Sequence, residues 1–218
     1  MIKKLLVVHP QDPTTAFLNK IVTYFEKALP PEQLTIKIIE PNKKSHDDCI
    51  ELLKEGDFDN MLFMGHGSST SIQGASNDSY KHAQLLSAND LHILGGKNLI
   101  FLSCNSNDLF RKAKSKSYIG FGDMPTDWNE ILAAREYEKD IYKGFTEETL
   151  EIYRSYLTKI IAKPLYDLTY SENYGLKACY LDIRLRINQL IATSYKDHNR
   201  NDVAYLMYNL RNDLTVRY

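Results

Sequence analysis

The chain has 218 residues, 43% of them hydrophobic and 25% charged, which suits one full-sized globular domain. Its 27 Lys and Arg residues against 28 Asp and Glu residues give a net charge of −1, which excludes a global field that would recruit nucleic acid or an anionic membrane. Three cysteines without C-x-x-C spacing argue against a disulfide framework and a zinc site, and no apolar run suits a signal peptide or a membrane span. We therefore expect a cytoplasmic protein with no metal and no cofactor.

The first part of the chain alternates short apolar runs with amphipathic stretches, which is typical of a parallel sheet flanked by helices. The apolar runs predict strands at residues 4–9, 34–40, 60–65, 98–103 and 117–121. Helices are predicted at residues 14–29, 45–54 and 108–116, with a further helical turn after Ser87. Residues 68–80 are small and polar, and they are predicted to form a loop.

Beyond Trp128 the chain has few Gly and Pro residues, and its apolar residues follow a helical period. Helices are predicted near residues 129–143, 146–162, 178–196 and 200–212. We expect this part to pack on the sheet.

Two predicted strands end in residues that can carry chemistry. Gly65, His66 and Gly67 follow one strand, and Cys104 follows the next, 104 − 66 = 38 residues later. In an open parallel sheet the carboxyl ends of neighbouring strands meet at one crevice. A histidine there can supply the base that makes a cysteine thiolate available as a nucleophile. The backbone N–H groups of Gly67 and Cys104 could then form an oxyanion hole, since Gly67 has no Cβ to hold a carbonyl oxygen away.

Each residue also has a structural interpretation. A cysteine at the end of an apolar strand is often a small buried hydrophobe, and a single histidine is commonly structural. The joint pattern of two apolar strands, one ending in Gly-His-Gly and the other in Ser-Cys-Asn-Ser, favours the catalytic interpretation.

The stretches NMLFMGHGSS (60–69) and NLIFLSCNSN (98–107) resemble the histidine and cysteine motifs of the caspase-like cysteine peptidases. This superfamily includes caspases, gingipains, clostripain, separase and the CHAT domains, and the closest likeness is to bacterial CHAT-type domains. The resemblance continues through SYIGFGDMPTDW (117–128) and covers roughly residues 1–145. Many relatives have Ala before the cysteine, where this chain has Ser103.

The resemblance implies a caspase-like α/β fold: an open, mostly parallel sheet flanked by helices at residues 1–145, with an α-helical C-terminal extension at 146–218 packed on it. It implies a cysteine-type endopeptidase with His66 as general base and Cys104 as nucleophile. Gly67 and Cys104 would supply the oxyanion N–H groups. No third residue that orients His66 can be identified in the sequence.

In such peptidases two loops supply the side chains that line the specificity pocket. One loop follows the first strand, and the other follows the strand that comes after the cysteine. Here these loops hold Asp12, and Asp123 with Asp127. The resemblance therefore implies cleavage after Lys or Arg, because carboxylates pair with these cations. Asp127 has an equally good interpretation as a helix N-cap.

The expected partner is a protein or peptide substrate, with no direct contact to nucleic acid and none to a membrane. The enzyme either acts alone or is regulated by a separate protein, and peptidases of this kind can be latent until a partner or a cut reorders the pocket loops. The alternative is a flavodoxin-like or degenerate caspase-like module that binds a partner protein and cleaves nothing.

Overall fold

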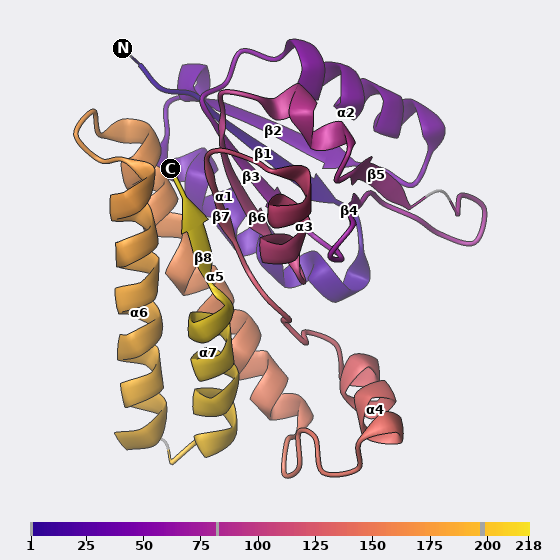
Figure 1. The fold of residues 1–218 in the computed structure, drawn as a ribbon, viewed down its shortest axis with the longest axis vertical. Coiled ribbons are helices and arrows are strands. Elements are labelled where there is room, and N and C mark those ends of the chain that lie inside the picture. The colour runs from indigo at the N-terminus through magenta and orange to yellow at the C-terminus, as the bar shows by residue number, and fades with distance from the viewer. Residues whose placement is uncertain (1, 82, 197–198) are drawn as a thin grey trace.

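The computed structural model describes residues 2–81, 83–196 and 199–218. Its centre is a six-stranded sheet with the order β2-β1-β3-β6-β7-β8, in which only β8 is antiparallel to its neighbour (Figure 1). The strands of this sheet are β1 (Leu5–Pro10), β2 (Leu34–Ile39), β3 (Asn60–Met64), β6 (Asn98–Leu102), β7 (Tyr118–Gly120) and β8 (Thr215–Arg217). The prediction of an α/β chain with a mostly parallel sheet is confirmed.

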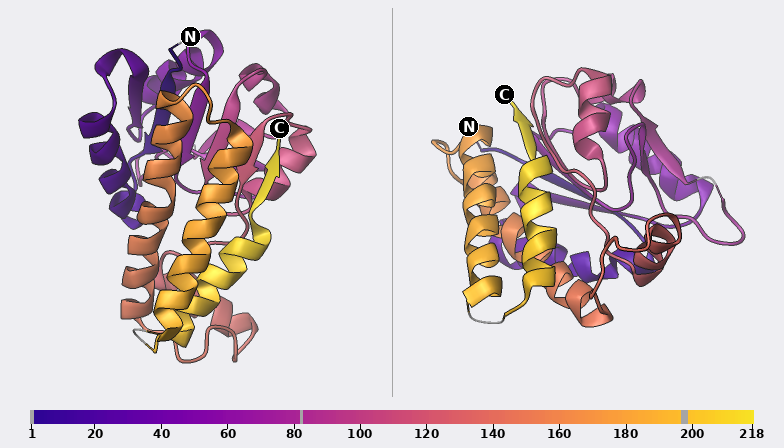
Figure 2. Two further views of the ribbon diagram at one scale, coloured as in Figure 1. Left: turned by 90° about the vertical axis from the view of Figure 1, so that its left-hand side faces the viewer. Right: turned by 60° about the horizontal axis from the view of Figure 1, so that its bottom comes forward.

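Helices cover both faces of the sheet (Figure 1). The α-helices are α1 (Asn19–Ala28), α2 (Lys43–Glu55), α3 (Ser106–Ala113), α4 (Trp128–Tyr137), α5 (Glu147–Tyr170), α6 (Leu176–Lys196) and α7 (Asn201–Asp213). Short 3-10 helices are η1 (Pro13–Leu18), η2 (Pro31–Gln33) and η3 (Asp90–Leu94). The left panel of Figure 2 looks onto the face where α5, α6 and α7 lie side by side, and α1 contacts α5 on this face. None of these helices combines the length and the apolar composition that crossing a bilayer requires.

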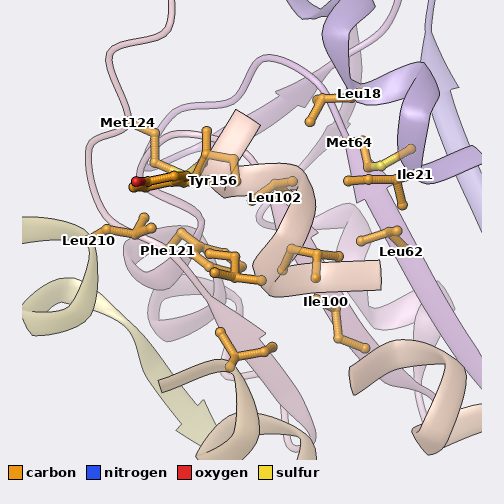
Figure 3. Packing of buried hydrophobic residues seen from close by; sticks show 14 of the residues in the cluster. Leu18, Ile21, Leu62, Met64, Ile100, Leu102, Phe121, Met124, Tyr156 and Leu210 are labelled. Atoms are coloured by element: carbon orange, nitrogen blue, oxygen red, sulfur yellow. The ribbon is translucent and has the colours of Figure 1, made fainter. Parts of the chain in front are cut away.

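The central strands are buried on both sides, which explains their unbroken apolar sequences. In β3, Leu62 and Met64 pack in the core under α1 and α5, whereas Met61 and Phe63 pack in the core under α2 and α3. Figure 3 shows the first of these cores, where side chains of the sheet meet Leu18 and α5. The two cores hold the ends of β3 and β6 firmly in place.

The segment at residues 68–80 is not the simple loop that we predicted. It contains β4 (Ser71–Gln73), which pairs antiparallel with β5 (Gln84–Ser87). Within this polar segment Ile72 packs in the core opposite Leu86 of β5, and one apolar residue is too weak a pattern to predict the short strand β4.

The helix predicted at 146–162 continues to Tyr170 and contains Pro164. Proline lacks the N–H that the carbonyl of Ile160 would otherwise accept, which normally ends a helix. Here Pro164, Leu165 and Leu168 are buried, so packing between α1 and α6 maintains the helix past the proline.

The C-terminal part contributes more than helices. After α7 the chain forms β8, which pairs with β7 through contacts such as Ile119 with Val216. The core under α1 and α5 combines residues from both parts of the chain, for example Ile119 and Phe121 with Leu157 and Leu210. The helical segment at 146–218 therefore completes the sheet and covers one of its faces.

Candidate functional site

His66 and Cys104 lie at the same edge of the sheet. β3 and β6 are adjacent and parallel, with Met64 opposite Leu102 as their last pair, and His66 and Cys104 each follow that pair by two residues. Both residues line one small pocket, together with Ser103, Met124 and Leu157. The two residues separated by 38 positions in the sequence are thus brought together, as the strand pattern predicts.

Gly67 packs directly against the turn that carries the cysteine. A Cβ at Gly67 would come within 2.7 Å of the Ser103 hydroxyl oxygen and 3.1 Å of the Cys104 carbonyl oxygen, so only glycine fits without displacement. Gly67 also forms a bridge with Ile72 in which the hydrogen bonds are made by its neighbours: His66 O accepts from Gln73 N, and Ser68 N donates to Ser71 O. In this type of antiparallel pair the N–H of Gly67 points away from the hairpin.

The backbone N–H groups of Gly67 and Cys104 have no hydrogen-bond acceptor in the backbone of the described residues. Two free donors beside a cysteine are what an oxyanion hole requires. Gly67 and Cys104 therefore stay the predicted oxyanion donors.

Asp12, the N-cap of η1, and Thr14, in its first turn, hold His66. Its Nε2 lies 2.9 Å from the Thr14 hydroxyl and 3.4 Å from Asp12 Oδ1. The Thr14 hydroxyl donates its proton to Asp12 Oδ1 at 2.5 Å, so it can only accept from His66. The arrangement therefore favours the tautomer with the proton on Nε2, which leaves Nδ1 as the free base.

Asp12 is ionised in this arrangement. Burial alone would raise the pKa of Asp12, but hydrogen bonds from Thr14 and the neighbouring His66 outweigh it and hold the pKa below its ordinary value. The sequence predicts Asp12 only as a substrate-binding residue, and it gives no residue that orients His66. Asp12 is also the N-cap of η1, where it accepts from Thr14 N at 2.8 Å, and the Asp-x-Thr pattern is the one local signal for its position.

Cys104 is a neutral thiol in this state. Burial, reinforced by the negative charge of Asp123, raises its pKa to about 12. The Sγ atom donates to the Met124 carbonyl at 3.4 Å, and no hydrogen bond joins it to His66 among the described side chains. The pocket in front of it has a volume of about 20 Å³, enough for about one water molecule and too small for a peptide.

The three predicted substrate carboxylates have different surroundings. Asp127 is the N-cap of α4 in a complete capping box with Glu130. Asp12 contacts His66 and Thr14, as described above. Asp123 is exposed, lies 3.4 Å from the Tyr142 hydroxyl and is close enough to Cys104 to affect its pKa. Asp123 is therefore the carboxylate with the fewest structural roles near the thiol.

The other two cysteines do not form a competing centre of this kind among the described residues. Cys49 and Cys179 are fully buried, and burial raises the pKa of each. No group of His, Cys, Asp and Glu side chains in the described part of the chain could hold a metal ion. No protein-family model matches the chain, and comparison with curated proteins finds no similar one.

Proposed function

We propose that the chain is a cysteine endopeptidase of the caspase-like, CHAT-like type, with His66 and Cys104 as its catalytic dyad. The observation that supports this most is the meeting of these residues at the ends of β3 and β6, with Gly67 packed on the turn that carries the cysteine. An imidazole, a thiol and two free backbone donors at one strand edge are the groups that acyl transfer needs.

In the proposed reaction, Nδ1 of His66 takes the thiol proton and the thiolate of Cys104 attacks the scissile carbonyl. The negative charge that develops on the oxygen is stabilised by the N–H groups of Gly67 and Cys104. The tetrahedral species collapses to a thioester as the amine leaves with the proton from His66. Water, deprotonated by His66, then hydrolyses the thioester, while the carboxylate of Asp12 stabilises the imidazolium in both halves.

The state described here is a resting state within this proposal. The protonated thiol, its contact with the Met124 carbonyl and the one-water pocket all prevent a peptide from reaching the nucleophile. Catalysis requires the segment at 122–127 to move away from Cys104, which would admit both the substrate and the imidazole. An enzyme of this design stays latent until something displaces that segment.

For the residue before the scissile bond we propose Lys or Arg, recognised first by Asp123. Its carboxylate is exposed and its charge already acts on Cys104. Asp127 and Asp12 would add negative potential from positions fixed by the cap of α4 and by His66.

The test uses acyloxymethyl ketone probes with Arg, Lys, Asp or Leu beside the reactive group, followed by peptide mass spectrometry. Once the site is opened by the nick described below, probes with Arg and Lys should label Cys104 alone, and Asp123→Asn should abolish their advantage over the Leu probe by removing the charge. Cys104→Ala and His66→Ala should each lose labelling and peptide cleavage by more than about 10³-fold with little change in thermal stability. His92→Ala, which alters an exposed histidine that does not line the pocket at Cys104, is the matched control. Wild-type cleavage by either dyad variant would disprove the assignment.

The second candidate is a module that binds a partner and cleaves nothing. It is favoured by the high pKa of Cys104 and the closed pocket, which also describe an inert buried cysteine. The two are separated by nicking the chain in the largely exposed segment 138–144 and repeating the labelling. A latent enzyme should gain labelling when the neighbouring loop is released, whereas Cys104 of an inert module should stay unlabelled in both forms.

A further inference from the structure

A second concave surface lies on the outside of the helical layer. It is a groove of about 500 Å³ between α1, α5 and α6, with Thr158 and Ala162 of α5 as its floor. These small side chains are one helical turn apart, so the floor lies below the walls, which include Tyr24 of α1 and Leu190 of α6. The left panel of Figure 2 looks onto this layer of helices.

Four cations line the groove, from three different helices: Lys20 of α1, Lys159 and Lys163 of α5, and Arg186 of α6. We call it the cationic groove. No carboxylate side chain of the residues that the structure describes lines it. In a chain with a net charge of −1, this is a local concentration of positive charge.

The four cations are not all neutralised within the chain. Lys163 pairs with Asp167, and Arg186 pairs with Asp182 at 3.0 Å. Lys20 and Lys159 form no ion pair within the described part of the chain, and Lys159 lies over the ring of Tyr156. The groove thus presents two positive charges without a carboxylate partner among the described residues, Lys20 on α1 and Lys159 on α5.

We propose that the cationic groove binds an acidic amphipathic helix of a partner protein. The part of α6 that lines it runs from Arg186 to Thr193, about two helical turns, which matches a partner helix with apolar residues at i, i+3 or i+4, and i+7. Those residues would contact Ala162, Tyr24 and Leu190, and flanking Glu or Asp side chains would pair with Lys20 and Lys159. A nucleic acid is less well matched, because it needs many unpaired cations along its backbone and finds two here.

The experiment begins with selection from a displayed library of helical peptides of about 14 residues, about four turns, randomised at all positions. The bait is the full chain carrying Cys104→Ser, so that the result does not depend on the proposed catalysis. The counter-selection bait carries Ala162→Gln in addition, which fills the floor without changing the charge. Enriched peptides should be net acidic, with apolar residues at helical spacing.

The best peptide is then synthesised with a fluorophore and its binding measured by anisotropy. Lys20→Glu with Lys159→Glu should weaken binding by about tenfold or more, because two attractive pairs become repulsive. Lys27→Glu with Lys54→Glu changes the net charge equally at exposed positions outside the groove, and binding should stay within about twofold.

Several results would overturn the proposal. The selection would contradict it if no peptide were enriched or if the enriched peptides lacked acidic residues. The binding measurements would contradict it if the peptide bound the Ala162→Gln chain equally well, or if the two pairs of lysine substitutions weakened binding equally. Displacement of the peptide by a single-stranded oligonucleotide at lower concentration than by unlabelled peptide would identify the groove as a nucleic-acid site instead. Because every arm measures binding alone, failure here leaves the proposed dyad untouched.

Discussion

Ser103, the residue before the proposed nucleophile, is an unusual side chain at this site. It is 1% exposed, and its hydroxyl has no hydrogen-bond partner in the described structure. It also lies where a Cβ of Gly67 would collide with it. An unpaired buried hydroxyl lowers the stability of the folded state. Its presence therefore indicates that residue 103 does not serve folding stability alone.

Ser103→Ala is expected to stabilise the chain by about 1 kcal/mol, because it removes an unpaired polar group and leaves the shape almost unchanged. Urea unfolding measures the change. Ser106→Ala is the matched control: its hydroxyl donates to Phe101 O at 2.7 Å and accepts from Phe121 N at 2.9 Å, so its loss should cost about 1–3 kcal/mol. Destabilisation by Ser103→Ala of the same size as the control would mean that the hydroxyl has a partner, such as a bound water.

At this scale the sequence predicted the proximity of His66 and Cys104 better than it predicted their surroundings. His66 and Cys104 could be placed together because each follows an apolar strand and such strand ends meet. Thr14 and Asp12 could not be assigned to His66, because the contact spans 52 positions and depends on how η1 folds back over the strand ends. The contact between Cys104 and the Met124 carbonyl is a backbone contact, for which the identity of residue 124 gives no signal.

Among the secondary-structure elements, the N-terminus of α4 raises the question of whether Asp127 stabilises the helix or binds the substrate. Asp127 accepts from Asn129 N at 2.8 Å, and Glu130 accepts from the backbone N–H of Asp127. Among the described residues, the Asp127 side chain makes hydrogen bonds only within this capping box.

Two substitutions of Asp127 separate these roles. Asn caps a helix about as well as Asp, so Asp127→Asn should keep stability within about 0.5 kcal/mol, whereas Asp127→Ala should lose about 1 kcal/mol. If the charge also helps to bind Lys or Arg substrates, both variants should raise KM for those substrates. Urea unfolding and steady-state kinetics give the two readouts. Equal stability of the Asn and Ala variants would contradict the capping role.

The central strands could be predicted from the sequence because both of their faces are buried. β1, β3 and β6 are buried on both faces and show it as unbroken apolar runs. β4 and β5 have few buried apolar side chains each, and β8 has partly buried Thr215 and Val216 with no run at all. These strands depend on tertiary pairing, which local patterns do not encode.

For the whole molecule, His9 makes stability depend on pH. It is a buried histidine of β1, with Nδ1 2.8 Å from the Met64 carbonyl, and burial lowers its pKa below the ordinary value of 6.5. As pH falls through 6.5, the unfolded chain takes up a proton at this position before the folded chain does. The folded state is therefore favoured above pH 6.5 and loses stability below it.

Unfolding in urea should show this loss, up to about 0.8 kcal/mol between pH 7.5 and pH 6.0. His9→Asn keeps a donor near the Met64 carbonyl but cannot titrate, so its stability should change less over the same range. The lowered pKa of Asp12 acts only in more acidic solution, so it does not contribute in this window. A slope that persists unchanged in the Asn variant would place the titrating group elsewhere.

The pairing of β7 with β8 has a consequence during synthesis. Ile119 and its partner Val216 are 216 − 119 = 97 residues apart, and all of α4, α5, α6 and α7 must emerge between them. At about 5–20 residues per second, the outer edge of β7 stays without a partner on the ribosome for about 5–20 seconds. Throughout that interval the nascent chain exposes an unpaired β edge next to apolar residues. We therefore expect chaperones to bind the nascent chain during synthesis.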